Sequence, residues 1–256
     1  MDFKGYSTDF SLEGRVALIT GGAAGIGRAI AELFYQKGAS LVLSDISPAV
    51  TGAAEEIAPD ASRRLALQGD VTKAADRKAT VDAAIAKFGR VDILVNCAGI
   101  ALLDSALEVT EERWDKTMDL NLKSVFFLSQ EVAPLMIRQG GGKIINLASQ
   151  AGIIALDKHA AYVASKAAVI GLTKVLTLEW ASKNIQANCI SPTVVLTELG
   201  KKAWAGEVGE AFKKTIPAGR FAYPEEIAAC ALFLASDASQ MINGANLVID
   251  GGYTIQ

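Results

Sequence analysis

Near its start the chain reads as a buried strand, a glycine-rich turn and a helix, and this succession constrains the fold more than any other feature. The strand-like run covers 15–20, the turn 21–27, and apolar residues at helical spacing follow over 28–34. Glycines at 21, 25 and 27 let the backbone turn sharply and approach a pyrophosphate at the helix N-terminus, where free N–H groups favour anions. Alone, such a turn equally suits close helix packing, but its flanking strand and helix favour a dinucleotide site.

Strand-like and helix-like stretches alternate along the remaining sequence. The strand-like runs lie near 15–20, 39–45, 64–69, 91–96, 142–149, 185–191 and 245–250, and the helical stretches near 25–37, 48–58, 73–88, 111–138, 160–182 and 224–236. Alternation of this kind predicts an α/β fold, a doubly wound seven-stranded parallel sheet with helices on both faces. We expect a single domain over 1–256, in which the irregular stretch 194–222 follows a strand and forms a substrate-binding lid.

Composition narrows the classes of function. The formal net charge of −3 and the lack of a basic stripe exclude a nucleic-acid partner. The apolar runs look short and interrupted, which predicts no membrane span, and residues 1–6 lack a signal-peptide pattern, which predicts a cytoplasmic protein. Cys97, Cys189 and Cys230 lack metal-ligand spacing, so we expect reduced core thiols and no metal site.

An acidic residue at the end of the second strand bears on the choice of cofactor. Asp45 lies about 20 residues beyond the glycines, where a carboxylate accepts hydrogen bonds from adenosine ribose hydroxyls and repels a 2′-phosphate. No Arg or Lys stands between Gly21 and Gly25, and Ile46 follows the acid. The electrostatics therefore predict NAD rather than NADP, although a turn acid ahead of the next helix would look the same.

A tyrosine and a lysine four residues apart suggest proton chemistry. Tyr162 and Lys166 share one face of a predicted helix, and Ser149 closes an apolar strand at the edge where α/β sheets keep their ligands. The free groups titrate near about 10 and about 10.4, and a neighbouring ammonium is expected to lower the pKa of the phenol. Such a pair alone is more often a buried tyrosine beside a solvated lysine.

Taken together, the ordered motifs resemble the short-chain dehydrogenase/reductase family over nearly the whole chain. The matching residues are Thr20-Gly21, Gly25-Ile26-Gly27, Asp70-Val71, Asn96, Ala98-Gly99, Asn121, Ser149, Tyr162, Lys166 and Pro192. The resemblance implies a Rossmann fold and a nicotinamide-dependent oxidoreductase whose catalytic group is Asn121, Ser149, Tyr162 and Lys166. It implies cofactor contacts from Gly21, Ala24, Gly25, Ile26, Gly27, Asp45, Ile46, Asp70, Val71, Asn96, Ala98, Gly99, Tyr162, Lys166, Pro192, Val195 and Thr197.

Several of these residues also have plain structural readings. Asp70 could belong to a helix N-cap region, Asn96 could brace the sheet, and Thr197 could cap the next helix or bond the nicotinamide carboxamide. Asn121 lies inside the predicted helix 111–138, where asparagine is intrinsically unfavourable. In the family this position holds a water that relays protons from the lysine.

The substrate class is inferred from one short segment and a few polar residues. Pro192-Thr193-Val194-Val195 replaces the family's usual Pro-Gly and resembles the xylulose and erythrulose reductase branch with its polyol-dehydrogenase relatives. Gln150, His159 and Trp204, with Ser149 and Tyr162, are the candidate substrate residues. We expect a short sugar alcohol, such as threitol or a pentitol, and its ketose. The alternatives are a 3-oxoacyl or other carbonyl reductase and a catalytically idle NAD-binding regulatory protein.

Two long helices carry more apolar surface than one sheet face needs. Phe126 and Phe127 in 111–138, and Val175 and Leu178 in 160–182, add to stripes already apolar enough to pack on the sheet. In related enzymes these surfaces build the two-fold contacts of a tetramer. The sequence predicts a homotetramer, with a dimer as the alternative.

Overall fold

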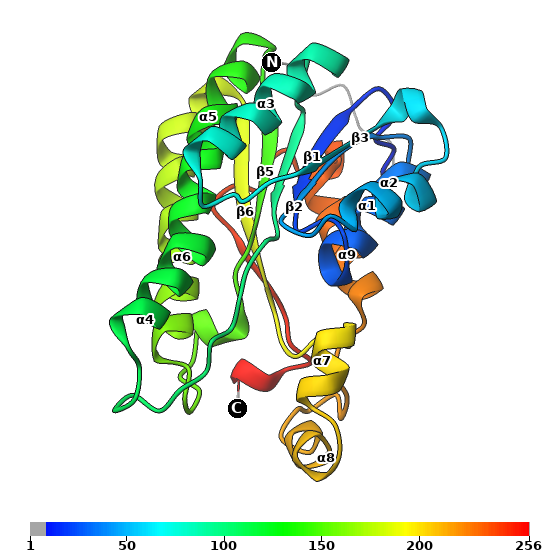
Figure 1. Ribbon diagram of the computed structural model, residues 1–256. Coiled ribbons are helices and arrows are strands. Elements are labelled where there is room, and N and C mark those ends of the chain that lie inside the picture. The colour runs from blue at the N-terminus through cyan, green and yellow to red at the C-terminus, as the bar shows by residue number, and fades with distance from the viewer. Residues whose placement is uncertain (1–8, 256) are drawn as a thin grey trace.

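The computed structural model describes residues 9–255 and confirms the predicted α/β fold (Figure 1). Residues 1–8 and 256 lie outside this part, and with them the stretch 1–6 in which we expect no signal peptide. Seven parallel strands form one sheet in the order β3-β2-β1-β4-β5-β6-β7. The order reverses between β1 and β4, and in such sheets ligands bind in the crevice at this switch point.

Both ends of every strand lie within two residues of the ends of the predicted run. They are β1 (Val16–Thr20), β2 (Ser40–Asp45), β3 (Arg64–Gln68), β4 (Ile93–Asn96), β5 (Gly142–Leu147), β6 (Ile185–Pro192) and β7 (Asn246–Ile249). β5 ends before Ser149, which leaves this residue just beyond the strand's carboxyl end.

Helices cover both faces of the sheet, as Figure 1 shows. One layer consists of α1 (Gly25–Gln36), α2 (Val50–Ile57) and α9 (Pro224–Ala235), and the other of α3 (Ala74–Phe88), α4 (Glu111–Met118), α5 (Ser124–Arg138) and α6 (Ala160–Trp180). Each layer buries its own core against one face: Ile19, Leu41 and Ile145 face the first layer, and Leu18, Val42 and Ile144 the second. Alternate strand residues point to opposite faces, so nearly continuous apolar strands can serve both cores.

Two stretches differ from the sequence-based expectation. The predicted helix 111–138 is interrupted by a π-helical turn, η2 (Asp119–Lys123), with buried Asn121 at its centre. The stretch 194–222 is not wholly irregular, because it contains the short helices α7 (Glu198–Ala203) and α8 (Glu207–Lys213). Both helices lie at the end of the molecule where the strands finish, below the sheet in Figure 1.

The helix α6 bears on the expectation that no segment of the chain spans a membrane. With the turn that follows it, over 160–183, it is long and apolar enough to cross a bilayer by length and composition. No other described helix passes that test. A core helix of a soluble protein passes the same test, and α6 contacts β6 in the folded chain.

Candidate active site

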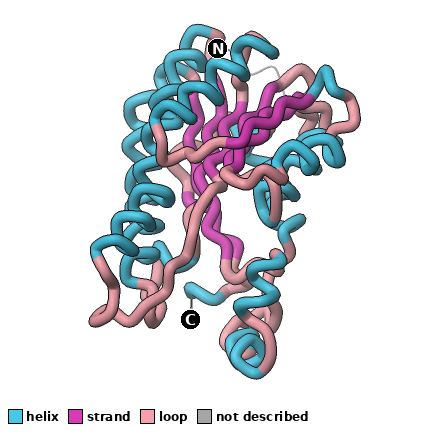
Figure 2. Tube along the Cα trace, in the orientation of Figure 1, coloured by secondary structure: helices cyan, strands magenta, loops and turns pink. Residues whose placement is uncertain are grey.

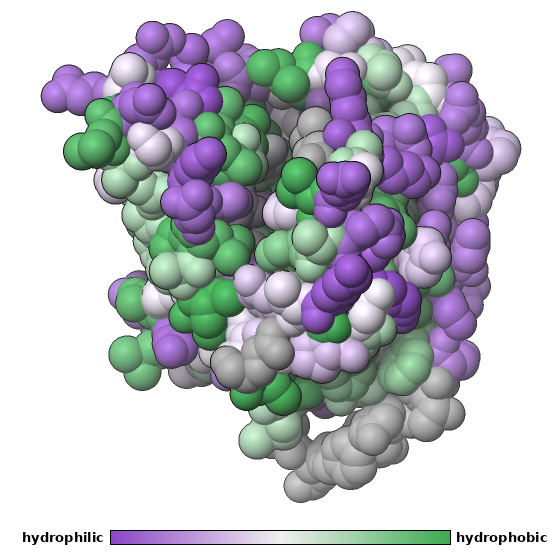
Figure 3. Space-filling view, turned by 90° about the horizontal axis from the view of Figure 1, so that it is seen from below, coloured by the Kyte–Doolittle hydropathy of each residue, from purple (hydrophilic) through white to green (hydrophobic). Residues whose placement is uncertain are grey.

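The loops that carry the predicted site residues gather at the carboxyl edge of the sheet (Figure 2). Seen from that end, the surface is hollowed between two flanks, and apolar residues lie on both sides of the hollow (Figure 3). The predicted site residues therefore lie at the end at which α/β sheets bind ligands.

The glycine-rich turn has the geometry that a pyrophosphate needs. A Cβ at Gly27 would lie 2.1 Å from the carbonyl oxygen of Gly21, so only glycine allows this close packing of turn and helix. Gly21 and Gly25 have φ of 68° and 58°, which also favour glycine. The N-terminus of α1 has no side-chain cap and no acidic residue in its first turn. Its backbone N–H groups therefore remain available to an anion.

Asp45 holds the same turn in place. Its carboxylate accepts hydrogen bonds from the backbone N–H groups of Ala23 (3.1 Å) and Ser47 (2.9 Å). Ile46 beside it is 68% exposed. Arg28 of α1 forms ion pairs with Glu32 and Glu56, both at 2.8 Å, so its charge is balanced within the chain.

A hydroxyl group that sequence reasoning treated only as part of a motif ties two strand ends together. The Thr20 hydroxyl accepts hydrogen bonds from the backbone N–H groups of Cys97 (3.0 Å) and Ala98 (3.1 Å). It thus fixes the end of β1 to the end of β4, on either side of the switch point. The signal for this role was a threonine at the last position of an otherwise apolar strand.

Asn96 braces the sheet, as one of its two readings suggested. Its amide donates to Ser129 Oγ (3.1 Å) and to Asn146 Oδ1 (2.8 Å), and the amide of Asn146 donates in turn to Thr173 Oγ1 (3.0 Å). The chain of polar groups runs from β4 through β5 to α6. It fixes α6, which carries Tyr162 and Lys166, relative to the sheet.

Ser149 and Tyr162 face each other across the site. Ser149 precedes η3 (Gln150–Gly152) and its hydroxyl accepts a hydrogen bond from Ala151 N (3.1 Å). Burial raises the pKa of Tyr162, and a hydrogen bond with Ser149 opposes that rise. The expectation that Lys166 holds the pKa of the phenol below its usual value is therefore wrong, because burial raises this pKa and the effect that opposes burial comes from Ser149.

Lys166, Asn121 and Gly99 converge behind the tyrosine. The buried ammonium of Lys166 donates to the carbonyl of Leu147 (2.6 Å) and lies 5.8 Å from the centre of the Tyr162 ring. Burial lowers the pKa of Lys166 to about 8, while Cys97 acts in the opposite direction. A Cβ at Gly99 would meet Asn121 Oδ1 at 3.2 Å and Lys166 Nζ at 3.6 Å, so the absent side chain leaves room at this point.

The side chain of Asn121 is fully enclosed and makes three hydrogen bonds. It accepts from Ile100 N (2.9 Å) and donates to Ile100 O (2.8 Å) and to Ser165 Oγ (3.2 Å). Ser165, which the sequence analysis did not single out, donates to the carbonyl of Tyr162 (2.8 Å). Its only signal was a small polar residue between Tyr162 and Lys166. Together, Asn121 and Ser165 join the π turn, the loop after β4 and the start of α6.

The other three candidate substrate residues, Gln150, His159 and Trp204, lie in different environments. Gln150 is 2% exposed, and its Oε1 has no hydrogen-bond partner in the described structure. His159 precedes α6, and its ring lies 6.0 Å from that of Tyr162 in an edge-on arrangement. Trp204 instead belongs to an aromatic cluster of the predicted lid. The centre of its ring lies 4.7 Å from that of Phe212 and 6.0 Å from that of Phe221.

The remaining predicted cofactor residues lie in loops at the same edge. The carboxylate of Asp70 accepts hydrogen bonds from the backbone N–H and the hydroxyl of Thr72. Burial raises the pKa of Asp70, but these hydrogen bonds together lower it by more, so the pKa lies below its usual value. Val71 is buried beside Asp70. Pro192 ends β6, Val195 bridges to Ala222, and Thr197 caps α7 by accepting from Gly200 N (3.0 Å). A Cβ at Gly25 would lie 3.1 Å from Thr197 Cγ2, which places the start of the lid over the glycine-rich turn.

A family model described as enoyl-(acyl carrier protein) reductase matches residues 21–254. A solved short-chain type dehydrogenase/reductase from Mycobacterium marinum superposes with a TM-score of 0.91 at 36% identity, covering 96% of this chain and 98% of that one. The chain belongs to the short-chain dehydrogenase/reductase family. Its Rossmann fold and its class as an oxidoreductase, both expected from the resemblance, are thereby confirmed.

Two curated relatives of this short-chain dehydrogenase/reductase are more similar still. An NAD-dependent glycerol dehydrogenase from Listeria innocua is 58% identical over 256 residues, the full length of both chains. A D-threitol dehydrogenase from Mycolicibacterium smegmatis is 53% identical over 249 residues, 97% of this chain and 96% of the relative. Both names describe polyol dehydrogenases, as the predicted branch of the family implies.

Proposed function

We propose that the chain is an NAD-dependent dehydrogenase that interconverts a secondary alcohol of a short sugar alcohol with the corresponding ketone. The observation that carries this proposal is the convergence of Ser149, Tyr162 and Lys166 at the carboxyl edge of the sheet, beside the glycine-rich turn. The names of the two polyol-dehydrogenase relatives support the substrate class.

The residues present fit a nicotinamide dinucleotide. The uncapped N-terminus of α1 suits its pyrophosphate, the Asp45 carboxylate suits the adenosine ribose hydroxyls, and Lys166 suits the ribose of the nicotinamide. Pro192, Val195 and Thr197 would flank the nicotinamide, and Asp70 with Val71 the adenine. When bound, the cofactor supplies the hydride acceptor.

In the oxidation direction, the Tyr162 phenolate takes the proton of the substrate hydroxyl. Ser149 donates a hydrogen bond to the same oxygen and stabilises the developing carbonyl. Lys166 places its positive charge behind the phenolate and favours its formation. Asn121 would hold a relay water near Lys166, through which the proton leaves. In the reduction direction Tyr162 returns the proton to the carbonyl oxygen.

Gln150 is the substrate residue with the best structural support. A buried amide oxygen without a partner is costly, and a substrate hydroxyl adjacent to the reacting carbon would satisfy it. His159 would offer a second hydrogen bond near Tyr162. Trp204 packs in the aromatic cluster of the lid, so it would act on the substrate site by holding the lid in position.

An initial-rate screen tests the proposal against its alternatives. NADH formation is measured by absorbance at alkaline pH with glycerol, threitol and several pentitols, and reduction is measured with a 3-oxoacyl thioester. Turnover of a polyol with NAD is the expected result. Preferred reduction of the thioester with NADPH would favour a biosynthetic reductase, and cofactor binding without any turnover would favour an idle regulatory protein.

We expect the enzyme to prefer NAD over NADP by on the order of 10²-fold in kcat/KM, because Asp45 repels a 2′-phosphate. In a variant that combines Asp45→Asn with Ile46→Arg, an acceptor for the turn remains and a cation replaces the charge. In this variant the ratio of kcat/KM for NAD to kcat/KM for NADP should fall about tenfold or more, while the KM for the polyol stays unchanged. Equal use of both cofactors by the unaltered enzyme would show that Asp45 has been misassigned.

We also propose that the protein is a homotetramer located in the cytoplasm. On α6, Val169 and Leu176 are buried against the sheet, but Val175 is 50% and Leu178 84% exposed. This second apolar stripe is of the kind that a neighbouring subunit covers. Light scattering coupled to size exclusion should give about four times the 26.8 kDa subunit mass. A Leu178→Glu variant should dissociate; a wild-type mass of one subunit would contradict the proposal.

A further inference from the structure

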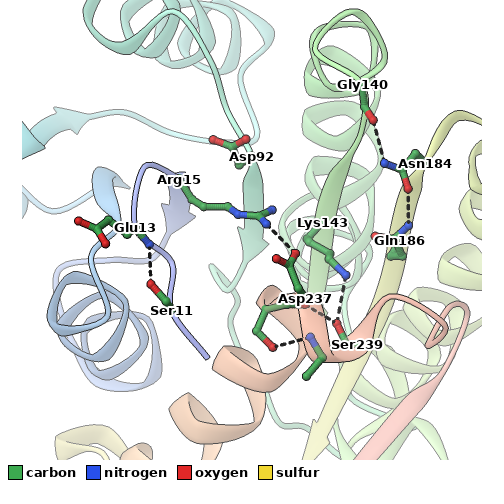
Figure 4. A network of polar contacts seen from close by, with 12 residues as sticks. Ser11, Glu13, Arg15, Asp92, Gly140, Lys143, Asn184, Gln186, Asp237 and Ser239 are labelled. Carbon is green, nitrogen blue, oxygen red and sulfur yellow. Dashed lines mark hydrogen bonds and ion pairs between the residues drawn. The ribbon is translucent and has the colours of Figure 1, made fainter. Parts of the chain in front are cut away.

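A polar cavity of about 520 Å³ lies at the amino edge of the sheet, at the opposite end of the strands from the candidate active site. Its volume falls within the range of small-molecule sites. Arg15 and Asp92 near the starts of β1 and β4 contribute to its lining, as do Lys143 and Gln186 at the starts of β5 and β6. Figure 4 shows these side chains around one space, with Asp237 approaching from the turn after α9.

Four of the charged groups neutralise one another in pairs. Arg15 contacts Asp237 at 2.6 Å, and Arg90 holds Asp92 through two hydrogen bonds of 2.8 and 2.6 Å. These contacts use one nitrogen of Arg15 and two of Arg90, so each guanidinium keeps further N–H groups. Of the remaining charges, Glu13 is exposed and therefore screened by water.

Lys143 is the buried charged residue of the cavity that belongs to neither ion pair. It lies in β5, between β4 and β6, and is only 3% exposed. Its ammonium donates to Ser239 Oγ (3.1 Å), and no carboxylate within residues 9–255 forms an ion pair with it. An ammonium has three donors, so two remain without a described partner. Burial and Arg15 lower the pKa of this lysine to about 8, and Asp237 acts in the opposite direction.

A buried lysine without a carboxylate partner needs a reason, because an apolar residue would fit a central strand at lower cost. We propose that the cavity binds a small oxyanion, the phosphate or carboxylate group of a hydroxylated metabolite, with Lys143 Nζ as its anchor. The spare N–H groups of Arg15 and Arg90 would complete the anion site. The side-chain amide of Gln186 would bind a neighbouring hydroxyl group.

Calorimetry on the whole protein tests the site. Inorganic phosphate and acetate serve as the phosphate and carboxylate probes, because neither is a polyol that could enter the proposed substrate site, and saturating NADH keeps anions away from the glycine-rich turn. We expect saturable binding of at least one anion at constant ionic strength, weakened about tenfold or more by Lys143→Met. The matched control Lys78→Met removes an exposed lysine of α3 and should leave binding unchanged.

The anion that binds more tightly shows whether the natural ligand carries a phosphate or a carboxylate group. Equal affinity in the wild-type protein and in Lys143→Met, or no saturable binding of either anion, would overturn the proposal. If Lys143→Met does not fold, a crystal structure of the wild-type protein with the bound probe decides. Density within hydrogen-bond distance of Lys143 Nζ is expected, and density only elsewhere would show that the lysine has a purely structural role.

Discussion

Replacing Tyr162 by phenylalanine is expected to lower kcat for polyol oxidation about 10²–10⁴-fold, the range attributed to general acid–base catalysis. The ring still fills its place beside Lys166, so the dissociation constant for NADH, followed by fluorescence, should change little. Tyr35→Phe is a matched control. It removes the phenolic hydroxyl of a tyrosine in α1 that packs against Arg63 outside the candidate site, and it should retain most of the activity.

The pH profile supplies a second readout for the same residue. Because burial raises the pKa of Tyr162, the phenolate fraction increases only at alkaline pH. Oxidation by the wild-type enzyme should therefore accelerate as the pH rises, and this dependence should disappear in Tyr162→Phe. A phenylalanine variant with wild-type turnover would refute the assignment of Tyr162 as the base.

Replacing Lys166 by methionine is expected to impair both catalysis and cofactor binding. The ammonium lies behind the Tyr162 ring and beside the space left by Gly99. In the proposed mechanism, its loss removes the charge that favours the phenolate and a donor for the cofactor ribose. We expect kcat to fall about 10²-fold or more and the dissociation constant for NADH to rise about tenfold.

Two comparisons separate these roles of Lys166. Lys123→Met, which removes an exposed lysine of the π turn, should have almost no effect on either constant. In Tyr162→Phe only kcat should fall, whereas in Lys166→Met both constants should change. A Lys166→Met variant that binds NADH normally would confine the lysine to the proton chemistry.

The sequence was sufficient to predict the sheet and the edge at which the site residues gather. Buried strands that serve two helical layers must be apolar throughout, and this pattern is visible in runs such as β1 and β5. The need for glycine at position 27 could also be predicted from the sequence. The structure gives the reason, because no other residue fits against the carbonyl of Gly21. These features are local, or they depend on one contact with a fixed partner.

Features that depend on the assembled environment could not be predicted. The π turn at Asn121 arises where the helix meets Ile100 and Ser165, far apart in the sequence. The pKa of Tyr162 depends on how completely the fold removes water from the phenol, which spacing along a helix does not reveal. The isolation of Lys143 likewise appears only once Arg15 and Arg90 have found their partners.

Transfer of deuterium tests most directly whether this chain moves a hydride from a secondary alcohol to NAD. The enzyme is given NAD and threitol that carries deuterium at both secondary carbons, and the reduced cofactor is analysed by mass spectrometry and NMR. We expect the NADH formed to carry deuterium at C4 of the nicotinamide, and Tyr162→Phe to form almost none. NADH without deuterium would show that a primary hydroxyl is oxidised and would contradict the proposed reaction.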